Sequence, residues 1–382
     1  MRNVKRNILL TPGPATTTDT VKFAQIVPDI CPRETEFGEL MESISTGLTR
    51  IVADENHYTC VLFGGSGTAA VDSVLSSVIG EDTVIIINNG AYGKRMCEIA
   101  TVYGVHFLEF VSPPDKPVDL IALEELFRST HQSISHLAVV HHETTTGLLN
   151  DVQRLGDLCK KYQAELIVDA ISSFGAVPIH MKDMNIGYIV ASSNKNVQGL
   201  PGVSFVIASK QTFEDLKQVR PRSYYLNLYD QYKYFLQHRQ MRFTAPIQTL
   251  YALQQAISEL RVEGIEQRYE RYTRSWESLT EGIHRMGLNH IVSEQYHSKL
   301  VTSISEPDCD GYDFQNMHDF FYNQGFTIYP GKVEKLKTFR IANIGDISHQ
   351  DIEAFLVLLE IYLQDIGFSL RKVVNTHVAE TE

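Results

Sequence analysis

The sequence has few cysteines and no long apolar stretch. Its 382 residues contain five cysteines spread along the chain, and no two form the Cys-X-X-Cys pair typical of zinc and redox sites. We therefore expect reduced thiols and no metal site. No apolar stretch approaches the ~20 residues of a membrane span. The basic start is followed by only three apolar residues, too few for a secretory signal. The expected location is cytoplasmic.

Positive charge is also scarce. Lys and Arg number 34 against 46 Asp and Glu, so the formal net charge is −12. A net acidic chain is unfavourable for binding nucleic acid or an anionic membrane, so we expect neither partner. A local basic cluster can still bind a small anionic substrate. The composition, 43% hydrophobic and 21% charged, is that of a folded globular protein.

Short, continuous apolar runs predict buried strands separated by helices. The run at 202–207 follows its predecessor too closely for a helical crossover, which is compatible with an antiparallel strand. This alternation predicts an α/β fold with a mostly parallel sheet in a large domain. The other predicted strands of this domain are 60–63, 83–87, 136–140, 166–168 and 188–191.

The pattern changes after residue 246 and predicts a second, smaller α+β domain. Long helical patterns lie at 247–286 and 349–364, and the strand candidates between them are shorter. We expect two domains, because the length exceeds that of one usual core. The predicted division is an N-terminal arm at 1–15, a large domain at 16–246, a small C-terminal domain at 247–370 and a polar tail at 371–382.

Glycine, aspartate and lysine follow predicted strands, at the edge where open α/β sheets bind ligands. The glycine-rich turn at 64–68 precedes a helical pattern and suits a phosphate, although a turn without a ligand fits it equally well. Asp169 is either a helix cap or ion-pair partner, or the partner of a protonated ring nitrogen. Lys195 is either a surface lysine or the nucleophile of Schiff-base chemistry.

An aromatic and an arginine add to this set. Tyr92, flanked by glycines, is either a core aromatic or a ring that stacks on a flat ligand. Arg340 lies in an apolar strand, as an ion-pair partner or as a bidentate clamp for a carboxylate or phosphonate. His141 and His142 are adjacent on a strand and point to opposite faces, which disfavours a shared metal. Phosphate cradle, stacking ring, acid, lysine and anion-binding arginine together indicate pyridoxal 5′-phosphate (PLP).

Several motifs resemble those of the class V, fold-type I PLP-dependent aminotransferases. The Leu-Thr-Pro-Gly-Pro stretch at 10–14 and the Ser-Asn-Lys-Asn stretch at 193–196 are general to that class. The Glu-Thr-Thr-Thr-Gly, Asp-Ala-Ile-Ser-Ser-Phe-Gly and Tyr-Pro-Gly-Lys stretches, which begin at residues 143, 169 and 329, look specific to its phosphonate branch. The resemblance covers nearly the whole chain. It implies a seven-stranded sheet in the large domain.

The resemblance also implies a role for each candidate residue. Lys195 and Asp169 would be catalytic, the first by binding the cofactor covalently and the second by pairing with its ring nitrogen. Arg340 would bind the substrate anion, with Arg33 either as a second contact or in a structural ion pair. Thr244 would reach the cofactor phosphate of a neighbouring subunit, which implies a homodimer with the site at the interface. The further implied cofactor contacts are Ser66, Gly67, Thr68, Tyr92, Thr144, Thr145 and Asn194.

The phosphonate branch implies transamination of 2-aminoethylphosphonate with pyruvate, giving phosphonoacetaldehyde and L-alanine in phosphonate degradation. An alanine– or serine–glyoxylate transaminase of the same class is the nearest alternative. An NAD-binding oxidoreductase would use the turn at 64–68, which lacks a full GxGxxG motif. A catalytically silent binding protein would have no need of Lys195, Asp169 and Arg340 together.

Overall fold

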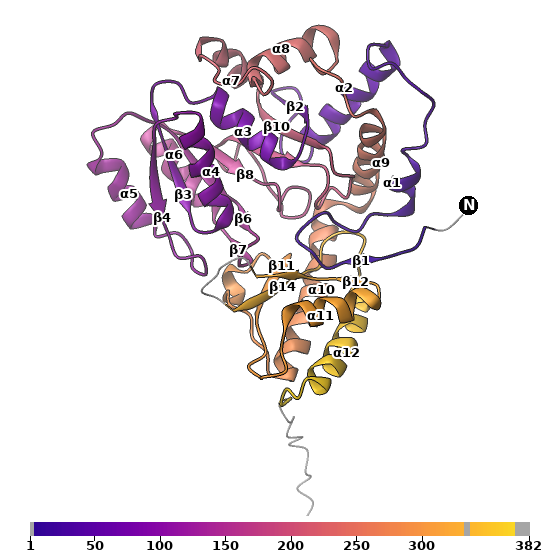
Figure 1. Cartoon of the computed structure of the whole chain (residues 1–382). Coiled ribbons are helices and arrows are strands. Elements are labelled where there is room, and N and C mark those ends of the chain that lie inside the picture. Colours follow the sequence, from indigo (N-terminus) through magenta and orange to yellow (C-terminus); the bar gives the residue numbers. More distant parts are fainter. Residues whose placement is uncertain (1–3, 332–336, 371–382) are drawn as a thin grey trace, which may run out of the picture.

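The largest sheet has seven strands, and one of them runs against the others (Figure 1). The computed structural model describes residues 4–331 and 337–370, so the predicted tail at 371–382 lies outside the described residues. In spatial order the strands are β2 (Tyr58–Gly64), β10 (Val203–Ser209), β9 (Ile186–Ser192), β8 (Glu165–Asp169), β5 (Ile134–Val140), β3 (Thr83–Asn88) and β4 (Phe107–Val111). β10 is antiparallel to β2 and β9, and the other neighbouring strands are parallel. The predicted α/β fold is confirmed.

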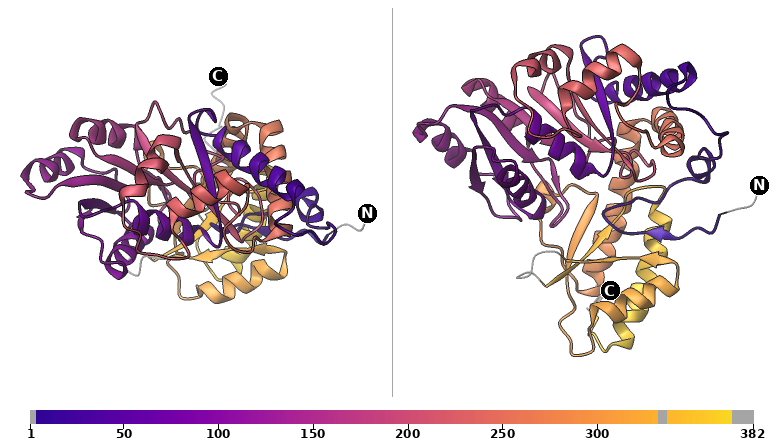
Figure 2. Two further views of the ribbon diagram at one scale, coloured as in Figure 1. Left: turned by 90° about the horizontal axis from the view of Figure 1, so that it is seen from above. Right: turned by 45° about the horizontal axis from the view of Figure 1, so that its top comes forward.

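Apolar side chains fill both faces of this sheet. In β2, Cys60 and Leu62 belong to the core on one face, whereas Val61 and Phe63 belong to the core on the other. Both faces therefore need helices, and helices surround the sheet in the views of Figure 2. The first face is covered by α2 (Thr35–Thr49), α5 (Leu120–Ser129), α6 (Val152–Tyr162) and α9 (Ile247–Glu263). The second is covered by α3 (Gly67–Ser77), α4 (Ala91–Val102), α7 (Lys210–Asp215) and α8 (Leu228–His238).

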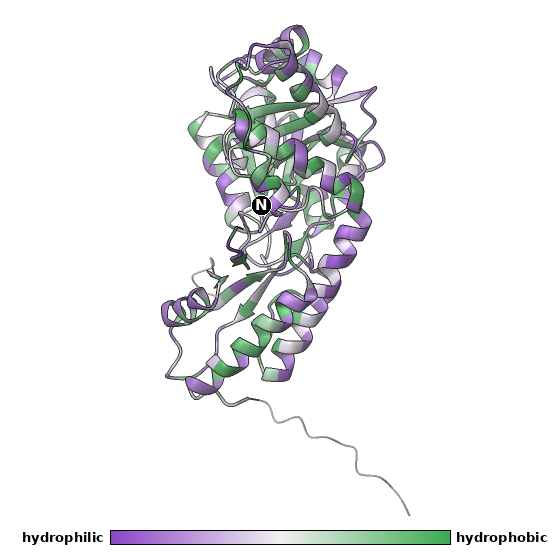
Figure 3. Cartoon of the chain, turned by 90° about the vertical axis from the view of Figure 1, so that its right-hand side faces the viewer, coloured by the Kyte–Doolittle hydropathy of each residue, from purple (hydrophilic) through white to green (hydrophobic). Residues whose placement is uncertain are grey.

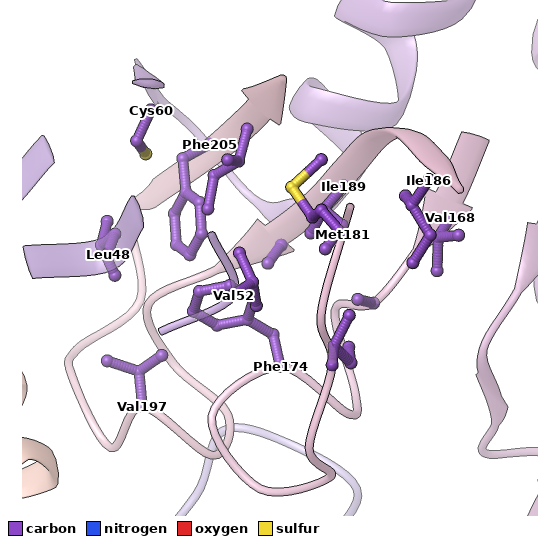
Figure 4. Close-up of a cluster of buried hydrophobic side chains, with 14 of the residues drawn as sticks. Leu48, Val52, Cys60, Val168, Phe174, Met181, Ile186, Ile189, Val197 and Phe205 are labelled. Atoms are coloured by element: carbon purple, nitrogen blue, oxygen red, sulfur yellow. The ribbon is translucent and has the colours of Figure 1, made fainter. Parts of the chain in front are cut away.

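The core on the first face anchors two loops at the carboxyl ends of the strands (Figure 4). Phe174 packs edge-on against Phe205 of β10, with ring centroids 5.1 Å apart. Val197, like Phe174, is fully buried in this cluster. Phe174 follows Asp169 by five residues, and Val197 follows Lys195 by two. The core therefore fixes the two loops that carry the predicted catalytic residues.

A second core lies in the lower part of Figure 1. Its antiparallel sheet consists of β11 (Val301–Ser305), β14 (Thr338–Ala342) and β13 (Tyr329–Pro330). Three helices pack here, namely α10 (Ile265–Met286), α11 (Phe314–Asn323) and α12 (His349–Asp365). Their apolar residues alternate with polar ones, as Figure 3 shows by colour. In the N-terminal arm, β1 (Ile8–Leu9) pairs in parallel with β12 (Phe326–Thr327) and so joins this part.

The domain boundary predicted after residue 246 stays a prediction, and the packing of α9 bears on it. Leu250, Leu253 and Ile257 of α9 belong to the core of the seven-stranded sheet. α9 packs against α2 and against the short helix α1 (Asp19–Phe23), whereas α10 packs against α12. The two helices that the sequence analysis grouped together thus contribute to different cores. The chain also has short 3-10 helices at Leu216–Gln218 and Glu294–Tyr296.

Within the described ranges, no helix combines the length and the apolar character needed to cross a bilayer. One strand of the large sheet, β4, was not among the sequence predictions. Its residues Phe107–Val111 include Glu109, and their side chains are half-buried or exposed because β4 lies at the edge of the sheet. An edge strand needs no continuous apolar run, so the composition of this segment does not indicate it.

Candidate active site

A cavity of about 500 Å³ opens at the carboxyl ends of the parallel strands. Its volume is in the range usual for sites that bind a small molecule or cofactor. It brings together the starts of α3 and α4, which cover the same face of the sheet, and the loops after β8 and β9. Its lining includes the predicted residues Ser66, Gly67, Thr68, Tyr92, Asp169, Asn194 and Lys195.

The N-terminus of α3 forms one wall of the cavity. Gly64 ends β2, and Ser66 is the N-cap residue of α3, with extended backbone and no capping bond from its side chain. The positive end of the helix dipole and the Ser66 hydroxyl can therefore both serve an anionic ligand. A Cβ at Gly67 would lie 2.6 Å from Cδ1 of Ile171, which also lines the cavity. The glycine thus lets the start of the helix approach the loop after Asp169.

Asp169 is the last residue of β8 and is only 5% exposed. Its Oδ1 accepts a hydrogen bond from the Ile171 N–H at 3.0 Å. Burial raises the pKa of Asp169 to about 6, and the charge of Glu143 adds to the rise. The Ile171 N–H and the cations Lys195 and Arg95 oppose it. A buried carboxylate among cations suits a protonated ring nitrogen.

Lys195 lies in the loop that follows β9, and the N-terminal arm reaches it. Its Nζ donates to the carbonyl oxygen of Pro12 and lies 3.4 Å from Oγ of Ser172. A Cβ at Gly13 would lie 2.6 Å from Cε of Lys195, and φ of Gly13 is +147°. Glycine is therefore needed where the arm passes the lysine. The sequence singled out this arm by its motif but gave it no role in the site.

Tyr92 lies in the first turn of α4, beside an arginine that the sequence analysis did not single out. The Arg95 guanidinium lies 4.9 Å from the ring centre of Tyr92, and its Nη1 is 3.4 Å from Oγ1 of Thr68. Both side chains line the cavity. Their spacing of three residues, one helical turn, is the only sequence signal for this pair. On the opposite wall, Asn194 lines the cavity and accepts a hydrogen bond from the Ser192 hydroxyl at 2.9 Å.

A short hairpin carries the Glu-Thr-Thr-Thr-Gly motif. It consists of β6 (His142–Glu143) and β7 (Leu148–Leu149), and Thr144 and Thr145 lie in the turn between them. Glu143 is completely buried, and the sequence analysis gave it no role. The Thr144 hydroxyl is buried and has no hydrogen-bond partner within the described part of the chain. Figure 1 shows β6 and β7 directed from the large sheet towards β11 and β14.

Arg340 extends from β14 to this hairpin and is only 2% exposed. Its Nε donates to the Pro330 carbonyl oxygen at 2.9 Å and its Nη1 to the Thr144 carbonyl oxygen at 3.3 Å. Burial lowers the pKa of Arg340, and the charges of Tyr92 and Glu143 oppose the decrease. No carboxylate among the described residues lies within salt-bridge distance of it. A buried guanidinium with donors to spare is suited to an anionic ligand.

Five predicted site residues are not among those that line the cavity, namely Arg33, Thr144, Thr145, Thr244 and Arg340. The Arg33 guanidinium donates to the Met241 carbonyl oxygen at 2.9 Å and also to Tyr234, Gln240 and Arg242. These acceptors are uncharged, so within the described residues Arg33 is not in the ion pair weighed as its alternative role. Thr244 is exposed, in the segment that leads to α9. Arg33 thus binds the segment that leads to Thr244.

His141 and His142 have separate partners. His141 Nδ1 lies 2.9 Å from the Ser173 hydroxyl, whereas His142 bonds to the Ser172 carbonyl oxygen and the Ser298 hydroxyl. In the part of the chain that the structure describes, no three side chains of His, Cys, Asp or Glu form a group that could hold a metal. Both rings therefore connect the hairpin to its surroundings.

The residues of the cavity fit PLP. A flat aromatic cofactor with a phosphate needs an anion cradle, a partner for its ring nitrogen and a lysine, and α3, Asp169 and Lys195 meet these needs in one cavity. The uncapped side chain of Ser66 leaves a polar group for such a ligand. Outside the cavity lining, the buried Thr144 hydroxyl has no hydrogen-bond partner among the described residues. Lys195 and Arg95 oppose part of the rise that burial causes in the pKa of Asp169.

Comparison with known proteins gives the same assignment. The family model for aminotransferase class-V matches residues 25–331. The chain is similar to 2-aminoethylphosphonate–pyruvate transaminases of Bacillus cytotoxicus (41% identical over 349 residues, 90% of this chain and 94% of the relative) and Klebsiella pneumoniae subsp. pneumoniae (39% over 357 residues, 92% and 96%).

Two solved structures share the fold over nearly the whole chain. The alanine–glyoxylate aminotransferase of Nostoc sp. has a TM-score of 0.86 at 26% identity, covering 95% of this chain and 96% of that one. The ureidoglycine–glyoxylate aminotransferase of Bacillus subtilis has a TM-score of 0.88 at 22% identity, covering 97% and 96%. Together with the match of the family model and the cavity that holds Lys195 and Asp169, they lead to one conclusion. The chain belongs to the class V aminotransferases, which are enzymes that use PLP.

Proposed function

We propose that this aminotransferase transfers the amino group of 2-aminoethylphosphonate to pyruvate, which gives phosphonoacetaldehyde and L-alanine in phosphonate degradation. The observation that carries the proposal is the buried Arg340, whose guanidinium binds two carbonyl oxygens and, among the described residues, has further N–H groups without an acceptor. A planar fork of donors suits a phosphonate and a carboxylate alike. Arg340 would therefore bind the donor in one half-reaction and pyruvate in the other.

Relatives support the choice of donor. Two proteins that are 41% and 39% identical over about nine-tenths of this chain carry the name 2-aminoethylphosphonate–pyruvate transaminase. The Tyr-Pro-Gly-Lys stretch that indicated the phosphonate branch begins at Tyr329, which pairs with Arg340 across β13 and β14. The Lys332 of that stretch lies outside the described residues. The motif thus adjoins the arginine that would bind the phosphonate.

The chain's own residues would divide the chemistry among them. When bound, PLP supplies an electron sink for the carbanion of the donor. The amine of Lys195 is the group we assign to take the proton from the carbon that bears the donor nitrogen. Asp169 would pair with the protonated ring nitrogen, and Ser66, Gly67 and Thr68 would bind the phosphate at the start of α3.

Of the two threonines considered for the ring hydroxyl, we assign the contact to Thr144. Its hydroxyl is buried without a partner in the described residues. The Thr145 hydroxyl is already engaged, because it donates to Glu143 and accepts from the Ala91 N–H. A buried hydroxyl without a partner is costly unless a ligand completes it.

The proposed enzyme is a homodimer. Thr244 is exposed, and the segment before it is held by Arg33. We assign Thr244 to the cofactor phosphate of the partner subunit, which would complete the cradle at α3. Arg33 would then act on the substrate site only by arranging the loop of residues 240–246, since its donors are occupied by Tyr234, Gln240 and backbone carbonyls.

One sister activity remains a second candidate. The alanine–glyoxylate aminotransferase of Nostoc sp. is 26% identical over 95% of this chain. An amino acid donor also carries an anion that Arg340 could bind. The identity is lower than the 41% to the phosphonate transaminase, and for that reason we place the phosphonate first.

The test is the visible absorption spectrum of the PLP-loaded protein before and after each donor is added without a keto acid. We expect the yellow band to bleach with 2-aminoethylphosphonate and to bleach far less with serine or alanine at equal concentration. Bleaching by serine or alanine in place of the phosphonate would move the function to the glyoxylate branch. A protein that cannot be loaded with PLP would contradict the site assignment itself.

A further inference from the structure

The first turn of α4 is capped by a hairpin more than fifty residues away. Its N-cap residue, Gly90, has no side chain with which to cap it. The N–H of Ala91 donates to the Thr145 hydroxyl at 3.3 Å, and the N–H of Tyr92 donates to Oε2 of Glu143 at 3.2 Å. The N–H of the next residue, Gly93, also helps to lower the pKa of Glu143. Two orphan donors of the helix are thus satisfied from β6 and the turn after it.

Every partner of Glu143 is a hydrogen-bond donor. Its Oε1 accepts from the N–H of Thr145 at 3.0 Å and from the hydroxyl of the same residue. Its Oε2 accepts from α4, whose dipole is positive at this end. Burial raises the pKa of Glu143, and these donors oppose the rise. An ionised carboxylate has lone pairs for all three of these donors, whereas a protonated carboxyl would direct a hydrogen at one of them.

The backbone is shaped to admit this carboxylate. A Cβ at Gly90 would lie 2.6 Å from Oε2 of Glu143 and closer still to its carboxyl carbon. The carboxylate cannot retreat, because its bonds to Thr145 and to α4 hold it on both sides. The glycine before α4 is therefore needed for the approach of Glu143.

Glu143 and Thr145, which cap α4, position two groups of the proposed site. α4 carries Tyr92, whose ring lines the cavity where the cofactor ring would lie. The residue after Glu143, Thr144, accepts a hydrogen bond from Arg340 through its carbonyl oxygen. Glu143 itself does not line the cavity. It is buried behind the surface that a ligand would touch and acts on the site through its neighbours.

We propose that Glu143 is a positioning residue that, as a carboxylate, caps α4 from the β6–β7 hairpin and so holds Tyr92 against the cofactor ring. This inference rests on the stacking role proposed for Tyr92. Glu143→Gln preserves the shape but has a single acceptor oxygen, so in either orientation its NH₂ group would face donors, those of α4 or those of Thr145. A residue that merely filled space would be replaced by glutamine without loss.

The experiment measures the affinity of the apo-protein for PLP by equilibrium titration, with no amino donor present. We expect Glu143→Gln to weaken PLP binding at least about tenfold. The matched control is Asp119→Ala, which removes a carboxylate that caps α5 through Ile121 and Ala122, away from the cavity. It should lower the unfolding temperature and leave PLP affinity within about twofold of wild type. Wild-type affinity in a folded Glu143→Gln protein would overturn the proposal.

A double-mutant cycle identifies the route of the effect. If Glu143 acts through Tyr92, then Glu143→Gln should add less than about twofold to the loss already caused by Tyr92→Ala. Full additivity of the two losses would overturn the proposal. Should Glu143→Gln fail to fold, Thr145→Val removes one donor to the carboxylate and the acceptor of the Ala91 N–H. It should weaken PLP binding by several-fold, again only while Tyr92 is present, and unchanged affinity would equally overturn the proposal.

These readouts need no donor. A protein that uses serine in place of the phosphonate would contradict the proposed function and would still show the same PLP affinities. Conversely, a failed cycle would leave the donor assignment intact. The two proposals therefore fail separately.

Discussion

Two helices, α3 and α4, begin at the cofactor cavity after a buried strand and a glycine, and they differ in what meets their first N–H groups. The side chain of the α3 N-cap residue, Ser66, makes no capping bond, so this end is left for a ligand. At the start of α4, the side chains of Glu143 and Thr145 accept hydrogen bonds from the first N–H groups. In the proposed assignment, one N-terminus binds an anion and the other supports Tyr92. Similar turns acquire different roles from what the tertiary structure places in front of them.

The largest expected effect is at Lys195, which lines the same cavity as the starts of α3 and α4. Lys195→Ala removes the amine assigned to proton transfer and should lower turnover at least about 10³-fold. The measurement is the steady-state rate with 2-aminoethylphosphonate and pyruvate, alongside thermal unfolding to show that the variant is folded. Turnover near the wild-type rate would contradict the mechanism. It would also remove the basis for the roles proposed for the starts of α3 and α4.

Acid should destabilise the protein through His141 and His142, which are buried at the hairpin that caps α4. The turn before α3 has no such buried histidines. Burial lowers the pKa of His141 to about 3 and that of His142 to about 4. The unfolded chain then binds protons at higher pH than the folded one, so stability is complete above about pH 6.5 and is lost as the pH falls towards 4. For His142 alone the loss is roughly 3 kcal/mol.

Asp169 acts in the opposite sense. Its folded pKa is raised to about 6, so its contribution improves as the pH falls through that value. The raised pKa of Glu143 acts in the same sense as that of Asp169, and the two carboxyls offset part of the loss at the buried histidines. The measurement is the free energy of unfolding of the apo-protein in urea at pH 7.5 and pH 5.0. Equal or greater stability at pH 5.0 would contradict this account.

Arg340→Lys tests the proposed anion-binding role of Arg340, which donates a hydrogen bond to the β6–β7 hairpin. Lysine keeps a charge but lacks the planar fork, so we expect KM to rise about 10- to 100-fold for both 2-aminoethylphosphonate and pyruvate. Single-turnover measurements of the two half-reactions check this. A defect confined to one of them would mean that the phosphonate and the carboxylate do not share Arg340.

Adding one methyl group to each turn compares the two helix ends directly. Gly90→Ala would press against the Glu143 carboxylate, which three hydrogen bonds hold in place, and should cost about 1–3 kcal/mol of unfolding free energy. Gly67→Ala would press most closely on Cδ1, the free end of the Ile171 side chain, with Cγ1 and Cγ2 at 3.0 and 3.2 Å, and should cost less, about 1 kcal/mol. Urea unfolding of the apo-proteins measures both. An equal or reversed order would mean that the carboxylate is not fixed.

The smallest stability effect is expected at the open helix end. Because Ser66 makes no side-chain cap, Ser66→Ala should leave the stability of the apo-protein within about 0.5 kcal/mol, yet raise the PLP dissociation constant about 5- to 10-fold. Asp119→Ala, at a helix that is capped, should cost about 1 kcal/mol and leave PLP affinity unchanged. A large loss of apo-protein stability in Ser66→Ala would show that the serine is structural.

Local sequence predicted most of the large sheet because its strands are buried on both faces. β3 and β5 are continuous apolar runs, and such runs have few alternatives in a folded chain. The edge strand β4 carries Glu109 and has no such run. The helix α9 was grouped with α10 because both are long and helical in pattern, but its apolar face packs on the large sheet. Which core a helix joins depends on the path of the chain.

The site shows the same division. Asp169 and Lys195 could be found because each ends or follows a buried strand, where polar groups gather in an open sheet. Glu143 stood in a motif that the sequence singled out, but its partners lie on α4, about fifty residues away. Arg95 carried no signal beyond its spacing from Tyr92. Arg33 was a candidate because of its motif, but in the structure its guanidinium donates hydrogen bonds to the segment of residues 234–242.

The sequence by itself determined the elements and the kind of chemistry. Apolar runs define strands, glycines mark the turns, and the lysine, acid and arginine limit the ligands that suit them. The tertiary structure decided which helix end stays open and which is capped. That choice depends on whether another segment brings hydrogen-bond acceptors to the same place, since a buried N–H must be satisfied by the protein or by a ligand. At α4 the protein satisfies it, and at α3 we expect the cofactor phosphate to do so.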